Sequence, residues 1–384
     1  MSLSQELNAR AMALGVPLSV HLDLTYRCNE RCVHCYLDHD DHGEMTTAEI
    51  KGVLDQLAEA GVFYLVFSGG EIFMRRDLFE LIEYARSLMF CVKLKTNACM
   101  IDAPKADRLA SLHLDCVQVS VYSHRPEVHD AITKLPHSLE RSITGIRLLR
   151  ARDIKVILAN VLMQQNVADH DGVRALAREL SAEYTVDPTV TPKMNGDRST
   201  IQFGIGNNEL VQLFSNSELT SDMKELCSKP SAIDDAVLDE TPCSAGHTSC
   251  YVSPYGDVYP CVQFPLPTGN LRKQRFLDIW RHSSGMNEVR SIRLRDLTTC
   301  STCTHVGNCT RCPGLAYMEG DMRGASSADC QKSIARTSIG NGEQSDESVR
   351  ISPPLLASGL IQIRQNRLSP PSDKQDGSAV GAVS

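Results

Sequence analysis

Cys28-Asn-Glu-Arg-Cys32-Val-His-Cys35 directly follows an apolar run, Leu18 to Leu24, that predicts a β-strand. The stretch sets three thiols at C-x3-C-x2-C spacing just beyond the end of that strand. Loops that follow the strands of parallel α/β folds commonly carry the functional groups. The spacing therefore predicts a thiolate site at the C-terminal edge of a sheet.

The loop offers three thiols, whereas a cubic iron–sulfur cluster has four irons to be ligated. Cys thiolates are the usual ligands of such clusters, and a [4Fe–4S] cube has four irons. One iron is then left without a protein ligand, as in catalytic metal centres, where an open position receives a reactant. We therefore expect this cluster to bind a reactant.

A second loop of this kind follows the next predicted strand and reads Ser68-Gly69-Gly70-Glu71. Glycine permits positive φ angles and a close approach of the backbone to a ligand. A Gly-Gly pair is also common in ordinary turns between a strand and a helix. We interpret this turn as part of a binding site because the Cys triplet is expected at the same edge of the sheet.

Strands and helices alternate through residues 18–225, and a capping box, Thr46-Thr-Ala-Glu49, opens one of the helices. Six units without hairpin signals predict parallel strands with right-handed crossovers. They are too few for a closed eight-unit barrel. We expect the α/β class, with a partial (β/α)6 TIM-like barrel. The predicted strands are Leu18–Thr25, Phe63–Phe67, Cys91–Thr96, Cys116–Val121, Ile154–Leu162 and Tyr184–Val190; the helices are Thr46–Ala60, Asp77–Leu88, Pro104–Leu112, Leu139–Arg150, Val173–Ser181 and Glu209–Phe214.

The 384-residue chain contains 15 Cys but has neither a signal-peptide pattern nor an apolar run of transmembrane length. We therefore expect a cytoplasmic protein without a membrane partner. Cytosolic thiols stay reduced, which favours clusters over disulfides. A net charge of −8 argues against a nucleic-acid partner.

Eight of the Cys gather in residues 243–330, where periodicity is poor. A predicted hairpin, Cys250 to Cys261, and a short helix, Phe276–Trp280, are the best-formed pieces. Such a region needs cross-links in place of a large apolar core, and bound metal can provide them because its binding free energy becomes folding free energy. The run Cys300-x2-Cys303-x5-Cys309-x2-Cys312 also fits a zinc ribbon, although its internal gap is short for one.

This reading divides the chain into five parts. We expect an N-terminal extension, a barrel, a linker, a small irregular iron–sulfur domain and a mostly disordered tail rich in Ser, Pro and Gly. The parts are residues 1–17, 18–225, 226–242, 243–335 and 336–384.

Taken together, the motifs resemble the radical S-adenosylmethionine (SAM) superfamily, and residues 243–330 resemble its SPASM auxiliary-cluster domain. In that family three Cys bind a [4Fe–4S] cube whose fourth iron is chelated by SAM. Reductive cleavage of SAM gives a 5′-deoxyadenosyl radical that abstracts a substrate hydrogen. The resemblance gives Cys28, Cys32 and Cys35 the catalytic cluster.

The resemblance also implies which residues contact SAM or support its pocket. An internal hydrogen bond is an equally good explanation for Ser120 and Asn160. Many members carry an acid and Gly where this chain has Tyr122 and Ser123, so no role is carried over to residue 122. The implied residues are Tyr36, Ser68, Gly69, Gly70, Glu71, Thr96, Asn97, Ser120 and Asn160.

Two auxiliary clusters are implied by the same resemblance, which makes three [4Fe–4S] clusters in all. Two residues separate Cys309 from Cys312, where members typically have three. The first implied ligand set is Cys243, Cys250, Cys261 and Cys312; the second is Cys300, Cys303, Cys309 and Cys330.

SPASM-bearing relatives mostly modify peptides, so the resemblance implies an oxidoreductase-type maturase of a ribosomally made peptide. It is similar to the maturases of the pyrroloquinoline quinone and mycofactocin precursors. The implied partners are a peptide or protein substrate, a separate leader-peptide-binding protein and an electron donor such as flavodoxin or ferredoxin. The alternatives are a formylglycine-forming sulfatase maturase and a non-catalytic, metal-stapled binding protein.

Overall fold

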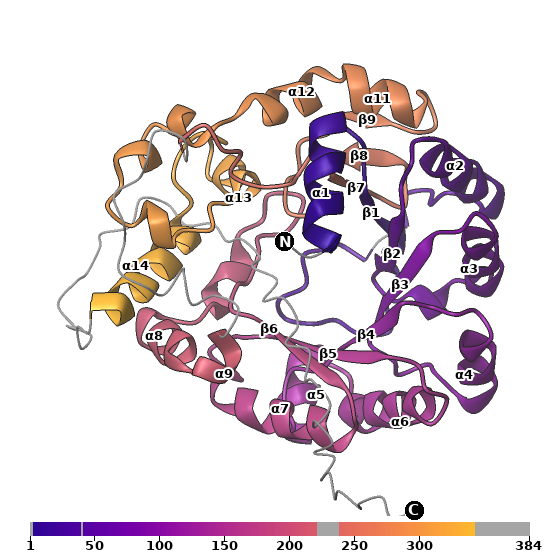
Figure 1. Ribbon diagram of the computed structural model, residues 1–384. Helices are drawn as coiled ribbons and strands as arrows, with labels where there is room; N and C mark the ends of the chain where they lie inside the picture. The colour runs from indigo at the N-terminus through magenta and orange to yellow at the C-terminus, as the bar shows by residue number, and fades with distance from the viewer. Residues whose placement is uncertain (1–2, 40, 221–237, 342–384) are drawn as a thin grey trace, which may run out of the picture.

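The computed structural model describes residues 3–39, 41–220 and 238–341. Within these ranges the strands form one nine-stranded sheet in the order β6-β5-β4-β3-β2-β1-β7-β8-β9. Strands β1 to β6 are parallel, and their connecting helices lie outside the curved sheet (Figure 1). No helix in the described ranges is long and apolar enough to span a bilayer.

The strands form the barrel and a short antiparallel extension of its sheet. They are β1 (Ser19–Thr25), β2 (Tyr64–Gly69), β3 (Cys91–Thr96), β4 (Cys116–Ser120), β5 (Val156–Val161), β6 (Glu183–Asp187), β7 (Ser249–Val252), β8 (Asp257–Tyr259) and β9 (Gly269–Asn270).

The α-helices include the crossovers of the barrel and the short helices of the C-terminal region. They are α1 (Leu3–Leu14), α2 (Thr47–Glu59), α3 (Leu78–Ser87), α4 (Ala103–Ala110), α5 (Pro126–Thr133), α6 (Ser138–Arg150), α7 (His170–Glu179), α8 (Asn207–Ser215), α9 (Ser217–Thr220), α11 (Phe276–His282), α12 (Ser284–Ser291), α13 (Pro313–Met318) and α14 (Ser327–Asn341). The 3-10 helices are η1 (Ile72–Met74), η2 (Val167–Asp169), η3 (Ser199–Phe203), η6 (Leu294–Asp296), η7 (Cys300–Thr302) and η8 (Val306–Asn308).

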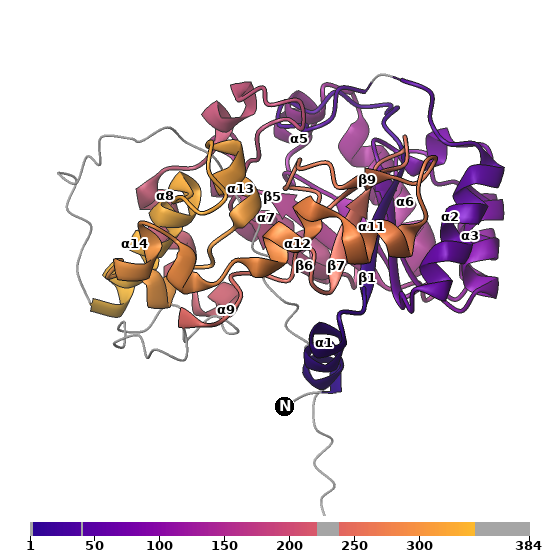
Figure 2. The ribbon, with the colours of Figure 1, turned by 90° about the horizontal axis from the view of Figure 1, so that it is seen from above.

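The predicted partial barrel is confirmed, with all six expected strands in a parallel sheet that does not close. The predicted capping box is also present, because Thr46 and Glu49 exchange side-chain and backbone hydrogen bonds at the start of α2. Helix α5 was not predicted. Helix α1 occupies most of the expected N-terminal extension and lies on the opposite side of the ring from α5 (Figure 2).

The predicted hairpin forms as β7 and β8, and it also extends the barrel sheet. Strand β7 pairs in parallel with β1, with Ser19 opposite Ser249 and Leu22 opposite Val252. Local turn signals predict the pairing within a hairpin, but they carry no information about which distant edge the hairpin will join. The C-terminal region is therefore continuous with the barrel through main-chain hydrogen bonds.

The two faces of the barrel strands differ in polarity. On β1 the side chains of Val20, Leu22 and Leu24 are fully buried in the main apolar core. Alternate residues point the other way, and the interior is polar, with His21 and Lys95 among the residues that line a cavity. Closed barrels fill their interior with branched apolar side chains, so this polar interior leaves room for a ligand.

The C-terminal boundary differs from the expected one. Helix α14 continues to Asn341, beyond residue 335, where the sequence placed the start of the tail. Arg336 on this helix is fully buried, so the helix is part of the packed structure. The remainder of the tail, Cys227 and most of the expected linker lie outside the described residues.

Candidate active site

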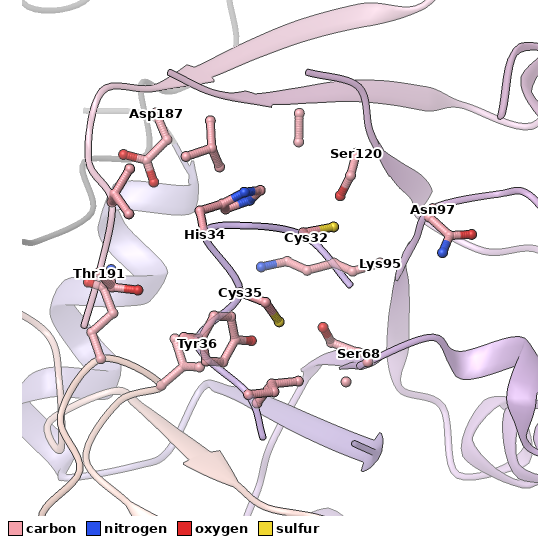
Figure 3. A pocket seen from close by; sticks show the side chains of 18 of the residues that line it. Cys32, His34, Cys35, Tyr36, Ser68, Lys95, Asn97, Ser120, Asp187 and Thr191 are labelled. Carbon is pink, nitrogen blue, oxygen red and sulfur yellow. The ribbon is translucent and has the colours of Figure 1, made fainter. Parts of the chain in front are cut away.

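A cavity of about 270 Å³ opens at the C-terminal ends of the barrel strands. The Cys28–Cys35 loop, the turn after β2 and the ends of β3 to β6 form its walls (Figure 3). The C-terminal region closes one side with Val262, Gln263, Pro265 and Met318. The cavity therefore lies between the barrel and the predicted auxiliary-cluster region.

All three thiols of the Cys28–Cys35 loop line this cavity. The unpredicted helix α5 holds the loop, because the amides of Arg31 and Val33 donate to the carbonyls of Thr133 and Ile132 at 2.9 and 3.0 Å. A strand end and a helix end thus fix the thiols before any ligand is bound.

Burial makes these thiols weaker acids than exposed cysteines. It raises the pKa of Cys28 to about 12 and that of Cys35 to about 11, and it also raises the pKa of Cys32. Neutral thiols are therefore favoured until a cation replaces the protons. Three sulfur donors that line one cavity and have this property fit a cluster in which irons supply the positive charge.

The Gly69-Gly70 turn packs against the chain's own backbone. Gly69 has a φ of +135°, and a Cβ atom there would lie 2.1 Å from the Thr25 carbonyl oxygen. A Cβ on Gly70 would lie 2.4 Å from the carbonyl oxygen of Arg27. Both glycines line the cavity. Both glycines are therefore required for the close packing of this turn on the entry of the Cys loop.

Glu71 joins the turns after β2 and β3. Its carboxylate accepts hydrogen bonds from Thr96 Oγ1 and the Asn97 amide at 2.8 Å and from the Phe73 amide at 3.0 Å. Asn97 Nδ2 in turn donates to Asn29 Oδ1 at 2.8 Å. Glu71 is buried, and its hydrogen bonds position Thr96 and Asn97, which line the cavity.

The other residues implied for SAM binding are also brought together. Tyr36, Ser68, Thr96, Asn97 and Ser120 all line the cavity, as does Asn160. Asn160 also has the internal hydrogen bonds considered as the alternative. Its Nδ2 donates to the Tyr184 hydroxyl at 3.4 Å, and its Oδ1 accepts from Asn166 Nδ2 at 3.4 Å.

The auxiliary thiols fall into two groups by their electrostatic influence on one another. Burial raises the pKa of Cys243, Cys250 and Cys312, and Cys261 lies near enough to raise each of them further if it were ionised. This group coincides with the first ligand set implied by the resemblance.

The second group behaves in the same way. Burial raises the pKa of Cys309 and Cys330, and Cys300 raises both further, while Cys303 acts on Cys300 and Cys330. Nowhere in the described ranges do three His, Cys, Asp or Glu side chains converge as ligands of a single metal ion.

A buried ion pair links the auxiliary region to the cavity wall. Asp329 and Lys332, on α14, lie 2.9 Å apart with side chains 1% and 2% exposed. Asp329 Oδ2 accepts a hydrogen bond from the Cys312 amide at 2.9 Å, and Lys332 Nζ donates to Thr189 Oγ1 at 3.3 Å. Thr189 itself lines the cavity.

Sequence reasoning missed several polar residues of the cavity. Lys95, Gln118 and Asp187 all line it. Their signal was present as polar side chains at alternate positions of predicted strands, such as Lys93 and Lys95 in Cys91–Thr96. That pattern indicates a polar barrel interior once the strands are known to form a barrel.

Comparisons with known proteins agree with this geometry. The Radical SAM superfamily profile matches residues 22–177, and the profile of the SPASM iron–sulfur cluster-binding domain matches residues 243–313. A PqqA peptide cyclase from Xanthomonas campestris is 31% identical and covers 84% of this chain and 89% of its own. This chain belongs to the radical SAM superfamily. It is an enzyme of the SPASM-bearing branch.

Two further relatives cover most of this radical SAM chain. The mycofactocin maturase MftC of Mycobacterium tuberculosis is 30% identical over 77% of this chain and 78% of its own. An AdoMet-dependent heme synthase from Methanosarcina barkeri is 27% identical over 79% of this chain and 93% of its own.

Solved structures show the same fold. SuiB from Streptococcus suis, bound to S-adenosylmethionine, has a TM-score of 0.68 and 17% identity, covering 85% of this radical SAM chain and 82% of that one. The enzyme anSMEcpe with bound AdoMet has a TM-score of 0.65 and 16% identity, covering 85% and 93%. Membership of the superfamily implies SAM and iron–sulfur clusters as cofactors, and together they supply a 5′-deoxyadenosyl radical.

Proposed function

We propose that this radical SAM enzyme modifies a ribosomally synthesised peptide, by cross-linking or oxidation, during maturation of a peptide-derived cofactor or natural product. The observation that carries the proposal is the relationship to two peptide maturases. Identities of 30% and 31% extend over more than three-quarters of the chain, through both the barrel and the SPASM region.

We assign the catalytic cluster to Cys28, Cys32 and Cys35, whose thiols line the cavity. The turn Ser68–Gly70 is suited to the SAM amino group, because its backbone lies beside the Cys loop. Tyr36, Thr96, Asn97, Ser120 and Asn160 complete the proposed SAM pocket.

We assign two further [4Fe–4S] clusters to the auxiliary thiols, which makes three per chain. The two electrostatic groups support the assignment to Cys243, Cys250, Cys261 and Cys312 and to Cys300, Cys303, Cys309 and Cys330. Among the eleven proposed cluster ligands only Cys250 is classed as buried, and it lies on β7 beside β1.

The proposed setting is the cytosol, where thiols stay reduced. A flavodoxin or ferredoxin would supply the electron, and a small leader-peptide-binding protein would deliver the substrate. The alternative of a formylglycine-forming enzyme rests on fold similarity to anSMEcpe at 16% identity. A tetrapyrrole substrate is a second candidate, because a heme synthase aligns over 93% of its own length.

The first experiment tests the radical chemistry. Anaerobically reconstituted protein with SAM and dithionite is expected to form 5′-deoxyadenosine, and about twelve irons per chain are expected for three cubes. The triple variant Cys28→Ala/Cys32→Ala/Cys35→Ala is the control and should form none. Equal 5′-deoxyadenosine from both proteins would reject the assignment of the catalytic cluster.

The second experiment tests the substrate class. A short peptide encoded beside the gene is incubated with the reconstituted enzyme and analysed by mass spectrometry. Loss of hydrogen mass at a defined residue supports the peptide assignment. An unchanged peptide, together with turnover of a propionate-bearing tetrapyrrole in a parallel reaction, would replace it by the second candidate.

A further inference from the structure

Lys95 and Gln118 form the floor of the active-site cavity. They are direct neighbours in the parallel pairing of β3 and β4, and both line the cavity. Side chains two residues apart on a strand share a face. Lys95 and Gln118 therefore lie one layer deeper than Asn97 and Ser120, which belong to the proposed SAM pocket.

Three polar groups that line the cavity lack partners, and two of them, on Gln118 and Asp187, are buried atoms. Figure 3 shows the Lys95 side chain directed into the cavity and Asp187 on the wall near His34. Within the described part of the chain, Lys95 takes part in no hydrogen bond or ion pair, and the buried atoms Gln118 Oε1 and Asp187 Oδ2 have none either. Buried polar atoms without partners are uncommon in native proteins and indicate a missing ligand or water.

The nearest carboxylate on β1 does not neutralise Lys95. Both oxygens of Asp23 are engaged, with His21 Nε2 at 3.0 Å and with the Tyr251 hydroxyl at 2.9 Å. Burial and the like charge of Lys93 lower the pKa of Lys95 to about 8, while Asp23, Cys261 and Asp187 act against that shift. An ammonium in these surroundings gains stability from an additional anion.

We propose that Lys95 and Gln118 form a carboxylate-binding subsite for the substrate residue that is presented to the radical. Asp187 accepts a hydrogen bond from an N–H or O–H group of the same residue. This inference rests on the proposed peptide substrate and narrows it to one whose reacting residue carries a carboxylate. The carboxylate belongs either to an acidic side chain or to the chain terminus.

The placement separates this subsite from the SAM pocket. The proposed SAM contacts lie at the strand ends, around Gly69, Gly70 and Asn97, whereas the Lys95 side chain leaves β3 one layer below them. A substrate residue bound here would extend from the floor toward the C-terminal end of β6. Its carboxylate would pair with Lys95, and the hydrogen-bond donor would face Asp187 on β6.

The test uses capped amino acids as probes on the reconstituted, SAM-bound full chain, with binding followed by anaerobic calorimetry. N-acetylglutamate N-methylamide presents a side-chain carboxylate, N-acetylalanine a terminal carboxylate, and N-acetylglutamine N-methylamide neither. One of the two carboxylates is expected to bind about tenfold or more tightly than the glutamine probe, since charge-assisted hydrogen bonds are the strong ones. The preferred probe identifies the source of the carboxylate.

Variants on strand β3 assign the effect to one side chain. Lys95→Met should remove the preference for the carboxylate probe, and Lys95→Arg, which keeps the charge, should retain most of it. Lys93→Met is the matched control, because Lys93 lies on the same strand but does not line the cavity. It should retain the preference for the carboxylate probe, because loss of the Lys93 charge only favours the protonated form of Lys95.

Three results would overturn the inference. The first is equal binding of all probes by the wild-type protein, including no detectable binding of any. The second is an equal loss of carboxylate binding in Lys93→Met and Lys95→Met. The third is a loss of SAM affinity in Lys95→Met as large as the loss of probe affinity, which would assign the ammonium to the cofactor. Probe preference without modification of any peptide would leave the subsite standing and reject the peptide substrate.

Discussion

The barrel thiols and the auxiliary thiols are positioned by different kinds of interaction. Below the Cys28–Cys35 loop lies an apolar core in which Leu22 and Leu24 are fully buried, and backbone hydrogen bonds to α5 hold the loop itself. The auxiliary region contains buried polar side chains, including Asp329, Lys332 and Arg336 on α14, and Asp329 accepts a hydrogen bond from the Cys312 amide.

This difference indicates which of the two sites is already ordered before its cluster binds. Apolar burial folds the barrel without help, so the catalytic loop is preorganised. Buried ion pairs contribute little net stability because desolvation offsets their attraction. Residues 243–286 share the main apolar core of the barrel, so we expect residues 300–330 in particular to depend on bound clusters for folding free energy, while the Asp329–Lys332 network positions this part against the barrel.

Removal of iron should produce the largest effect. A chelator applied under reducing conditions is expected to abolish protection of amides in residues 300–330, because metal binding supplies folding free energy. Amides of β1 to β5 should keep their protection. Hydrogen exchange with mass spectrometry measures both regions at once. Equal loss of protection in the barrel would show that the contrast between the two sites does not exist.

Asp329→Ala should be the most damaging single substitution in the auxiliary region. It leaves Lys332 buried without its ion-pair partner, and such a loss costs about 3–5 kcal/mol. Urea denaturation of the reconstituted protein gives the value. The exposed pair Asp102–Lys105 has a comparable spacing, so Lys105→Ala serves as the control and should cost less than about 1 kcal/mol. Similar costs for the two variants would contradict a special role for burial.

Gly70→Ala tests the preorganised barrel site. The added Cβ would overlap the Arg27 carbonyl, so a cost of about 1–3 kcal/mol and a loss of SAM binding are expected. Gly52 on α2 has open space where a Cβ would be added. Gly52→Ala should therefore stabilise the protein by about 0.5–1 kcal/mol. Thermal unfolding and SAM titration of both variants make the comparison, and a Gly70→Ala protein that binds SAM normally would disprove the packing argument.

The free energy of unfolding should depend on pH through Asp187, which lies on the wall of the barrel cavity. Burial raises its pKa from 3.8 to about 7 in the folded protein. Between these values the folded state keeps a proton that the unfolded state releases, so the unfolding free energy falls as the pH rises. The slope is at most about 1.4 kcal/mol per pH unit. Denaturation from pH 4.5 to 7.5 should show a shallower decline for Asp187→Asn, and identical slopes would refute the assignment.

The smallest effect is expected at the surface contact between the two regions. Arg272 Nε and Glu49 Oε1 form an ion pair at 2.7 Å, and the two side chains are 36% and 38% exposed. Arg272→Ala should cost less than about 1 kcal/mol, because water screens such pairs. The cost should shrink further at 1 M salt. A larger, salt-independent loss would mean that this contact, and not the buried network, docks the regions.

Much of the barrel was predictable because its signals are local. Apolar runs, the Thr46–Glu49 capping box and the Gly-Gly turn each determine nearby structure, and the Cys spacing fixed the position of the thiol loop. Helix α5, Pro126–Thr133, was missed although it holds that loop, and it is only eight residues long. The residues proposed for the SAM pocket were inferred by resemblance, and the structure brings all of them except Glu71 to one cavity.

By itself, the sequence determined the parallel barrel, the thiol triplet at its edge and the gathering of eight Cys in residues 243–330. These follow from periodicity and spacing, which act over a few residues. Only the tertiary structure decided that β7 extends the barrel sheet beside β1, that Asp329 and Lys332 connect Cys312 to Thr189, and that Lys95 and Asp187 share a cavity. Such contacts join segments far apart in the chain, and their partners are chosen by packing and charge, which no local pattern records.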